Sequence, residues 1–171
     1  MKIYIGFSRP TAKFAPFAWA IQAIEKRPYD HAYVRMQEPK NNQWMIFQAS
    51  KTMVNMFSIP WFLHANIVIK EYEIECSSEH YAKLWKFAMD NLGVPYSTKQ
   101  IIGIFLRKIF HIKQILPDGT SGEVCSELAA RVCKIMDIPI TEDLDSITPS
   151  DLDELLSSFS IPCVLTPTIG T

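Results

Sequence analysis

The period of the hydrophobic pattern changes along this chain, and this change constrains the fold more than any other feature of the sequence. Apolar residues alternate with polar ones, or form short apolar runs, in segments typical of strands: residues 2–7, 30–36, 43–49, 51–57 and 67–74. Helical spacing marks other segments, most of them later in the chain: residues 14–25, 78–92, 98–112, 122–137 and a helix that begins near residue 148. Strands early and most helices later predict an α+β fold.

Capping residues delimit two of these helices. Ser77 or Ser78 supplies an N-cap hydroxyl, and Gly93 terminates the helix that follows. Thr148 and Pro149 begin the last helix, with acidic residues in the first turn, where the helix dipole favours them.

The composition indicates one packed domain. The chain has 171 residues, of which 48% are hydrophobic and 20% are charged, so it can bury a substantial core. No repeat, low-complexity tract or long linker divides it, and we expect a single domain over residues 1–171. The 17 basic and 18 acidic residues give a net charge of −1, and no basic run offers a surface for nucleic acid. Nucleic acid is therefore not an expected partner.

The apolar stretches are too short or too polar to target or anchor the chain. The N-terminal stretch is interrupted after residue 7, which argues against a signal peptide. Residues 101–110 contain Arg107 and Lys108 and cannot span a bilayer. We therefore expect a cytoplasmic protein, with release by lysis or incorporation into a phage particle as the routes to any target outside the cell.

The four cysteines, Cys76, Cys125, Cys133 and Cys163, include no Cys-x-x-Cys pair. In a chain without a secretion signal we interpret them as reduced thiols. A zinc site would need ligands at short spacing, and no pair of cysteines or histidines has it. The sequence therefore predicts no metal and no other cofactor.

The second and third predicted strands form a hairpin around a polar turn. A turn centred at residues 39–40 would place His31 opposite Gln48 and Met36 opposite Gln43. Because side chains alternate along a strand, the two strands would share one face made of alternate residues: His31, Tyr33, Arg35, Trp44, Ile46 and Gln48. A slip of one residue would remove this arrangement, so it depends on the register.

Cys125 lies in the first turn of the helix predicted at residues 122–137. The unpaired N–H groups and the partial positive charge of a helix N-terminus stabilise a thiolate. The N–H of Cys125 could donate to a developing oxyanion, and Gly122 would let a substrate approach the backbone beside it. The alternative is that Cys125 is a small buried apolar residue, as we expect of Cys133.

His31 is the candidate base for this thiol. It follows Asp30 and, in the predicted register, faces Gln48, whose amide oxygen could fix the tautomer of the imidazole. Taken alone, a strand histidine is more often structural, and Gln48 would be a solvated strand residue. The other three histidines have no comparable surroundings.

Several segments of the chain form a pattern that is more specific than any one of them. They are residues 29–34 (YDHAYV), 44–49 (WMIFQA), 92–97 (LGVPYS) and 124–129 (VCSELA), followed by 147–152 (ITPSDL). In this order they resemble the permuted papain-like cysteine amidases, a branch of the NlpC-type superfamily whose acyltransferase relatives include lecithin:retinol acyltransferase. The opening residues 6–9 (GFSR) resemble the family's lead-in to the histidine strand, so the similarity runs from about residue 3 to residue 156.

This resemblance implies a catalytic histidine at His31, a third polar residue at Gln48 and the nucleophile at Cys125. It also implies an antiparallel sheet or partial barrel packed against the helix that carries the nucleophile. Tyr96 matches a family tyrosine near the site, and its alternative role is a loop anchor whose hydroxyl is satisfied locally. Many relatives have a carboxylate where this chain has Gln48, and an amide cannot stabilise an imidazolium by charge.

The expected function is hydrolysis of an amide (peptide) or acyl-ester bond through a thioester on Cys125. One alternative keeps the fold without the activity, as a binding or assembly protein. Another is a lipid acyltransferase whose apolar segment at residues 101–110 rests in a membrane interface. The expected partner is a peptide or acyl-ester substrate, and the sequence does not choose among peptide, lipid and protein-conjugate substrates.

Overall fold

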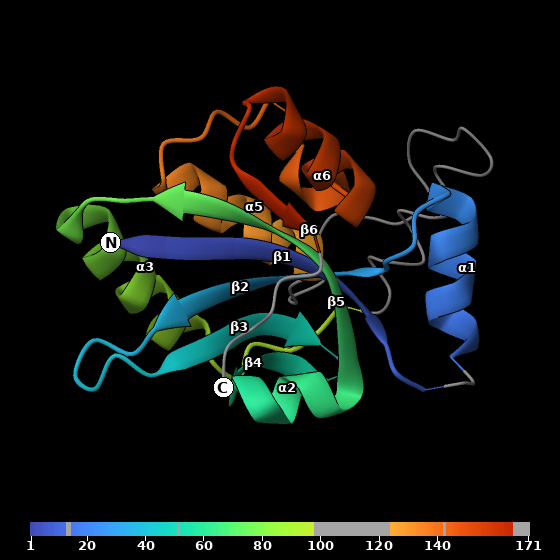
Figure 1. Cartoon of the computed structure of the whole chain (residues 1–171), viewed down its shortest axis with the longest axis horizontal. Coiled ribbons are helices and arrows are strands. Elements are labelled where there is room, and N and C mark those ends of the chain that lie inside the picture. The colour runs from blue at the N-terminus through green and yellow to red at the C-terminus, as the bar shows by residue number, and fades with distance from the viewer. Residues whose placement is uncertain (13–14, 51, 98–123, 142, 166–171) are drawn as a thin grey trace.

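The computed structural model describes residues 1–12, 15–50, 52–97, 124–141 and 143–165. Its strands form one open, antiparallel six-stranded sheet in the order β4-β3-β2-β1-β5-β6 (Figure 1). The strands are β1 (Lys2–Pro10), β2 (His31–Gln37), β3 (Trp44–Ser50), β4 (Met53–Ser58), β5 (Asn66–Glu75) and β6 (Cys163–Leu165). The helices of the described residues are α1 (Pro16–Glu25), α2 (Ile59–Ala65), α3 (Ser78–Asn91), α5 (Cys125–Ile135), α6 (Pro149–Ser158) and a 3-10 helix (Leu144–Ser146).

Each face of the sheet has its own core. On one face, leucines of α3, α5 and α6 belong to a cluster with Ala32 and Val34 of β2. On the other face, Phe62 of α2 packs in a smaller cluster with Tyr33 of β2 and Ile46 of β3. Figure 1 shows α2 on the near side of the sheet, apart from α5 and α6. The helix α5 therefore packs on the face of β2 to which Ala32 and Val34 point.

The α+β architecture predicted from the change in periodicity is confirmed. The first strand is longer than predicted, because residues 8–10 continue to pair with β5 after a bulge between Phe7 and Ser8. Between the strands predicted at residues 51–57 and 67–74, Pro60 and Trp61 lie in the helix α2, which was not predicted; proline occupies its first turn and needs no intrahelical N–H partner. The strand β6 was not predicted. The helix predicted at residues 98–112 lies outside the described residues.

The predicted hairpin is correct in its strands and faces but wrong in its register by two residues. Met36 pairs with Met45 instead of Gln43, and Arg35 pairs with Ile46. A shift of two residues preserves the alternation of side chains, so the predicted shared face is retained. His31 and Gln48 are consequently diagonal neighbours instead of directly opposed residues.

The capping residues predicted for α3 and α6 are confirmed. The side chain of Ser77 accepts a hydrogen bond from the His80 N–H at the start of α3, and Gly93 follows the helix with a φ of 85°. Thr148 and Asp151 form a reciprocal capping box at the start of α6. Among the helices described, none has the length and hydropathy that a membrane span requires.

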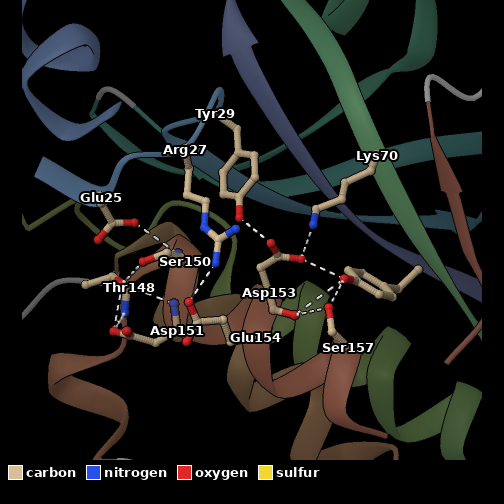
Figure 2. A network of polar contacts seen from close by, with 11 residues as sticks. Glu25, Arg27, Tyr29, Lys70, Thr148, Ser150, Asp151, Asp153, Glu154 and Ser157 are labelled. Carbon is tan, nitrogen blue, oxygen red and sulfur yellow. Dashed lines mark hydrogen bonds and ion pairs between the residues drawn. The ribbon is translucent and has the colours of Figure 1, made fainter. Parts of the chain in front are cut away.

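A polar network fastens α6 to the segment that leads into β2 (Figure 2). Buried Asp153 of α6 accepts hydrogen bonds from Tyr29 and from Tyr72 (2.6 Å) and forms an ion pair with Lys70. Glu25 accepts a hydrogen bond from the Ser150 N–H at 2.9 Å. These contacts fix the chain just before His31, because α6 is itself packed into the core.

The same network includes an exposed ion pair between Arg27 and Glu154 at 2.6 Å.

Burial opposes ionisation of Asp153, but the hydrogen bonds from Lys70, Tyr29 and Tyr72 outweigh it and lower the pKa of this carboxyl. The stabilisation is therefore complete above the pKa of an unfolded aspartate and is lost as the pH falls through the lower pKa of the folded state.

We predict that Lys70→Met lowers the free energy of unfolding by about 3 kcal/mol, because it leaves the buried Asp153 carboxylate without its cation. Urea unfolding followed by circular dichroism measures this change. The matched control is Lys2→Met, since Lys2 forms a half-exposed pair with Glu73 and its loss should leave the unfolding midpoint unchanged. Equal unfolding midpoints for the two variants would contradict a structural role of the buried pair.

Candidate active site

The sheet opens between β2 and β3 at the end where His31 lies. The ladder between these strands runs only from Val34–Phe47 to Gln37–Trp44. Beyond it, residues 31–33 pair with β1, and residues 48–50 pair with β4. The two strands are thus held by different neighbours, and backbone groups of β2 are left without a partner in β3.

Cys125 is the first residue of α5, and its thiol lies at this opening. The N–H of Ala32, a residue of β2 outside the β2–β3 ladder, donates a hydrogen bond to the Cys125 sulfur. The N–H of Ser126 donates to the same sulfur from the first turn of α5. The thiol therefore sits beside the peptide that joins His31 to Ala32.

Burial outweighs the stabilisation of the Cys125 thiolate that was expected from the helix N-terminus. Cys125 is only 4% exposed, and burial raises the pKa of its thiol to about 11, although the N–H groups of Ala32 and Ser126 act in the opposite direction. The negative charge of Asp30 raises the pKa further. Desolvation thus outweighs the helix end, and the resting group is a neutral thiol that needs a base.

The candidate base is His31, and its surroundings favour the neutral form of the imidazole. The Nε2 atom of His31 lies 2.7 Å from the Oε1 atom of Gln48. Burial lowers the pKa of His31, against the opposing effects of Gln48 and Asp30. A neutral imidazole whose Nε2 donates to an amide oxygen keeps Nδ1 free to accept a proton.

Asp30 places a carboxylate between the catalytic candidates. It interacts electrostatically with His31 and with the thiol of Cys125, and it accepts a hydrogen bond from Gln22 of α1 at 2.9 Å. Burial raises the pKa of this carboxyl, and the hydrogen bond from Gln22 limits the rise. Asp30 can therefore supply part of the negative charge beside the imidazole that Gln48, as an amide, lacks.

Tyr96 reaches the same site from the turn after α3. Backbone hydrogen bonds join this turn to the start of β4: Gly93 N–H to Val54 C=O, Val54 N–H to Val94 C=O, and Tyr96 N–H to Thr52 C=O. Burial raises the pKa of the phenol well above 10, and a hydrogen bond with the Cys125 thiol adds to the rise. Of the two predicted roles for Tyr96, the structure favours the one beside the thiol.

Of the four side chains predicted for the site, Gln48 contacts His31 and Tyr96 contacts Cys125, and Asp30 interacts electrostatically with both His31 and Cys125. Gly122, the predicted point of substrate approach, lies outside the described residues. Within the described residues, no hydrogen bond joins the thiol directly to the imidazole, and the link runs through the Ala32 peptide and Asp30. Catalytic contacts are often long in a protein without substrate.

Cys133 behaves as expected, fully buried with a thiol pKa raised to about 12.

Two features of the site were not predicted from the sequence. Ser8 is directly opposite His31 in the β1–β2 ladder, and its buried hydroxyl has no hydrogen-bond partner among the residues that the structure describes. Asn55, opposite Gln48 in the β3–β4 ladder, accepts a hydrogen bond from the Gln48 amide at 3.2 Å. Only the register of the ladders reveals these two neighbours.

The described residues contain no group of three or more His, Cys, Asp or Glu side chains that could together hold a metal ion. His80 lies 3.1 Å from a single carboxylate, that of Asp137.

Comparison with known proteins relates this chain to a solved structure but to no family. No protein-family model matches the sequence, and no curated protein matches it. The fold is similar to the crystal structure of metalloprotein yiiX from Escherichia coli O157:H7, with a TM-score of 0.54 and 19% sequence identity. The match covers 97% of this chain and 87% of the other. At this identity the likeness shows a shared fold.

We predict that the Cys125 thiol of the free protein titrates with a midpoint near its raised pKa of about 11. The ultraviolet absorbance of the thiolate, recorded as a difference between the wild type and Cys125→Ser, measures this midpoint. Asp30→Asn should lower it, because the carboxylate no longer opposes the thiolate. A wild-type midpoint below the ordinary thiol value of about 8.5 would contradict the dominance of burial.

Proposed function

We propose that this protein is a cysteine hydrolase that cleaves an amide or acyl-ester bond through a thioester on Cys125. The observation that carries the proposal is the position of the thiol at the start of α5, next to the peptide that links His31 to Ala32. A neutral imidazole oriented by Gln48 lies at the same end of β2. These are the elements that nucleophilic catalysis by cysteine requires.

The first chemical step follows from the protonation states of the two groups. Because the thiol is neutral at rest, His31 acts as a general base and takes the thiol proton on Nδ1 while the sulfur attacks the carbonyl carbon. The carbon–sulfur bond forms as the carbonyl π electrons move to the oxygen. The tetrahedral intermediate then expels the amine or alcohol, which receives the proton from Nδ1, and a thioester remains on Cys125.

Water then hydrolyses the thioester, with His31 again as the base and the Cys125 sulfur as the leaving group. His31 takes a proton from water, whose oxygen attacks the thioester carbon, and collapse of the second intermediate releases the acid and returns the proton to the sulfur. An alcohol or amine in place of water would make the enzyme an acyltransferase. The proposal therefore covers both reaction classes and differs between them only in the acceptor.

Two donors are proposed for the oxyanion. The N–H of Cys125 belongs to the first turn of α5, where N–H groups have no intrahelical partner. The Tyr96 hydroxyl keeps its proton because its pKa is raised, so it can donate a hydrogen bond at neutral pH. Both donors lie beside the sulfur and could reach an oxygen on the attacked carbon.

The arrangement supports a permuted papain-like fold as part of this proposal. In this fold the histidine strand precedes the helix that bears the nucleophile, as β2 precedes α5 here, and the helix packs on an antiparallel sheet. The proposed chemistry also needs reduced thiols, and the four cysteines are unpaired. A cytoplasmic location remains the proposal that fits this requirement.

The experiment is acylation by a small activated ester, which needs no knowledge of the natural substrate. The chain is prepared with Cys76→Ser and Cys163→Ser, because these two thiols are more exposed than the others. We expect p-nitrophenyl acetate to release p-nitrophenol in a burst and to add one acetyl group to Cys125. Peptide mass spectrometry locates the group, and hydroxylamine should remove it.

In the same background, His31→Ala should lower the acylation rate by about 100-fold or more, because no base takes the thiol proton. In the protein that retains His31, the acylation rate should rise with pH through the His31 pKa, which lies below the ordinary value of 6.5. The rate should change little from there to neutral pH. The control is Cys133→Ser, which removes a buried thiol away from the site and should leave the rate unchanged. Acetylation that persists in Cys125→Ser, or that is insensitive to His31→Ala, would refute the proposed function.

A further inference from the structure

Gln48 is held by a second amide, that of Asn55 on β4. These residues are directly opposed in the β3–β4 ladder, and the Nε2 atom of Gln48 lies 3.2 Å from Oδ1 of Asn55. The Nδ2 atom of Asn55 lies 3.0 Å from the carbonyl oxygen of Met53 and 3.3 Å from the hydroxyl of Ser50. A short chain of hydrogen bonds thus runs from a backbone carbonyl to His31.

Each amide in this chain can be oriented from its partner. A backbone carbonyl only accepts hydrogen bonds, so the end of Asn55 that faces Met53 must be the NH₂ group. Oδ1 of Asn55 then faces Gln48, which must present its own NH₂ group to it. This leaves Oε1 of Gln48 toward His31, at 2.7 Å from Nε2.

The orientation of Gln48 determines where the proton lies on His31. Because an amide oxygen is only an acceptor, the Nε2 atom that faces it must carry a hydrogen. Burial keeps the imidazole neutral, so it holds a single ring proton and Nδ1 has none. Gln48 is 3% exposed, which shields this hydrogen bond from exchange with water.

We infer that Asn55 is a positioning residue that fixes the reactive tautomer of His31 through Gln48. The inference deepens the proposed function and rests on it for its consequence, because Nδ1 is the atom that takes the thiol proton. The tautomer itself is a property of the free protein and can be measured without any substrate.

The experiment compares Asn55→Leu with Asn55→Asp. Leucine has no acceptor for the Gln48 NH₂ group, so Gln48 can turn over and the imidazole can hold its proton on either nitrogen. Aspartate keeps an acceptor at the same place and should preserve the orientation of Gln48. Long-range proton–nitrogen NMR spectra of ¹⁵N-labelled protein, at a pH where His31 is neutral, report which ring nitrogen is protonated.

We expect the wild type and Asn55→Asp to show the Nε2–H tautomer alone, and Asn55→Leu to show a mixture of tautomers. The acylation rate of Cys125 should fall roughly 10- to 100-fold in Asn55→Leu, as for other residues that orient a functional histidine from behind. A wild-type protein with its proton on Nδ1, or a pure Nε2–H tautomer in Asn55→Leu, would overturn the inference. If Asn55→Leu does not fold, a proton on Nδ1 in the wild-type spectrum would still overturn the inference.

The two proposals fail in different ways. If the tautomer shifts as expected but Cys125 is never acylated, the positioning role of Asn55 holds and the hydrolase proposal fails. If Cys125 is acylated at equal rates in both Asn55 variants while the tautomer stays fixed, the hydrolase proposal holds and the role of Asn55 fails.

Discussion

The contact between the Ala32 N–H and the Cys125 sulfur, which lowers the pKa of the thiol, joins α5 to β2 at the candidate site. It exists because β3 leaves β2 after the Val34–Phe47 pair, so a backbone donor that would bond to a neighbouring strand is available to another group. The first turn of α5 takes that place. The start of α5 and the start of β2 are thereby joined at one point.

The position of this point is fixed from several directions. The helix α5 packs through its apolar stripe on the β2 face that carries Ala32 and Val34, and α6 holds the segment before β2 through Glu25 and Tyr29. The turn containing Tyr96 is fixed to β4 by backbone hydrogen bonds. Because separate elements are held by separate contacts, the site is organised before any substrate binds. Its least reactive feature is the thiol of Cys125, which is neutral and buried.

The sequence was sufficient to select the candidate residues but not to predict their geometry. Alternation along two short strands placed His31 and Gln48 on one face, and this survived a register error of two residues, because an even shift keeps the faces. The error arose in the turn: the Glu38 N–H bonds to the Gln43 C=O, and Asn42 adopts a left-handed conformation with a φ of 58°. Local composition does not reveal that geometry.

Other features could not be predicted because they depend on contacts between distant segments. Asn55 matters only through its cross-strand partner, and the hydroxyl of Ser8 only through the strand pair that puts it opposite His31. The thiol pKa of Cys125 depends on how deeply the fold buries it, which reverses the effect expected from the helix end alone. Propensity and spacing identify the groups, and packing determines their protonation.

The most direct test of the central claim is a cross-link between the thiol and the imidazole. 1,3-Dibromoacetone alkylates one nucleophilic atom and then a second within reach, losing one bromide at each step, and peptide mass spectrometry identifies both ends of the bridge. We predict a bridge between Cys125 and His31 in the folded protein and none after unfolding in urea. A folded protein in which Cys125 is alkylated but bridges only to some other residue would contradict the proposed pairing of nucleophile and base.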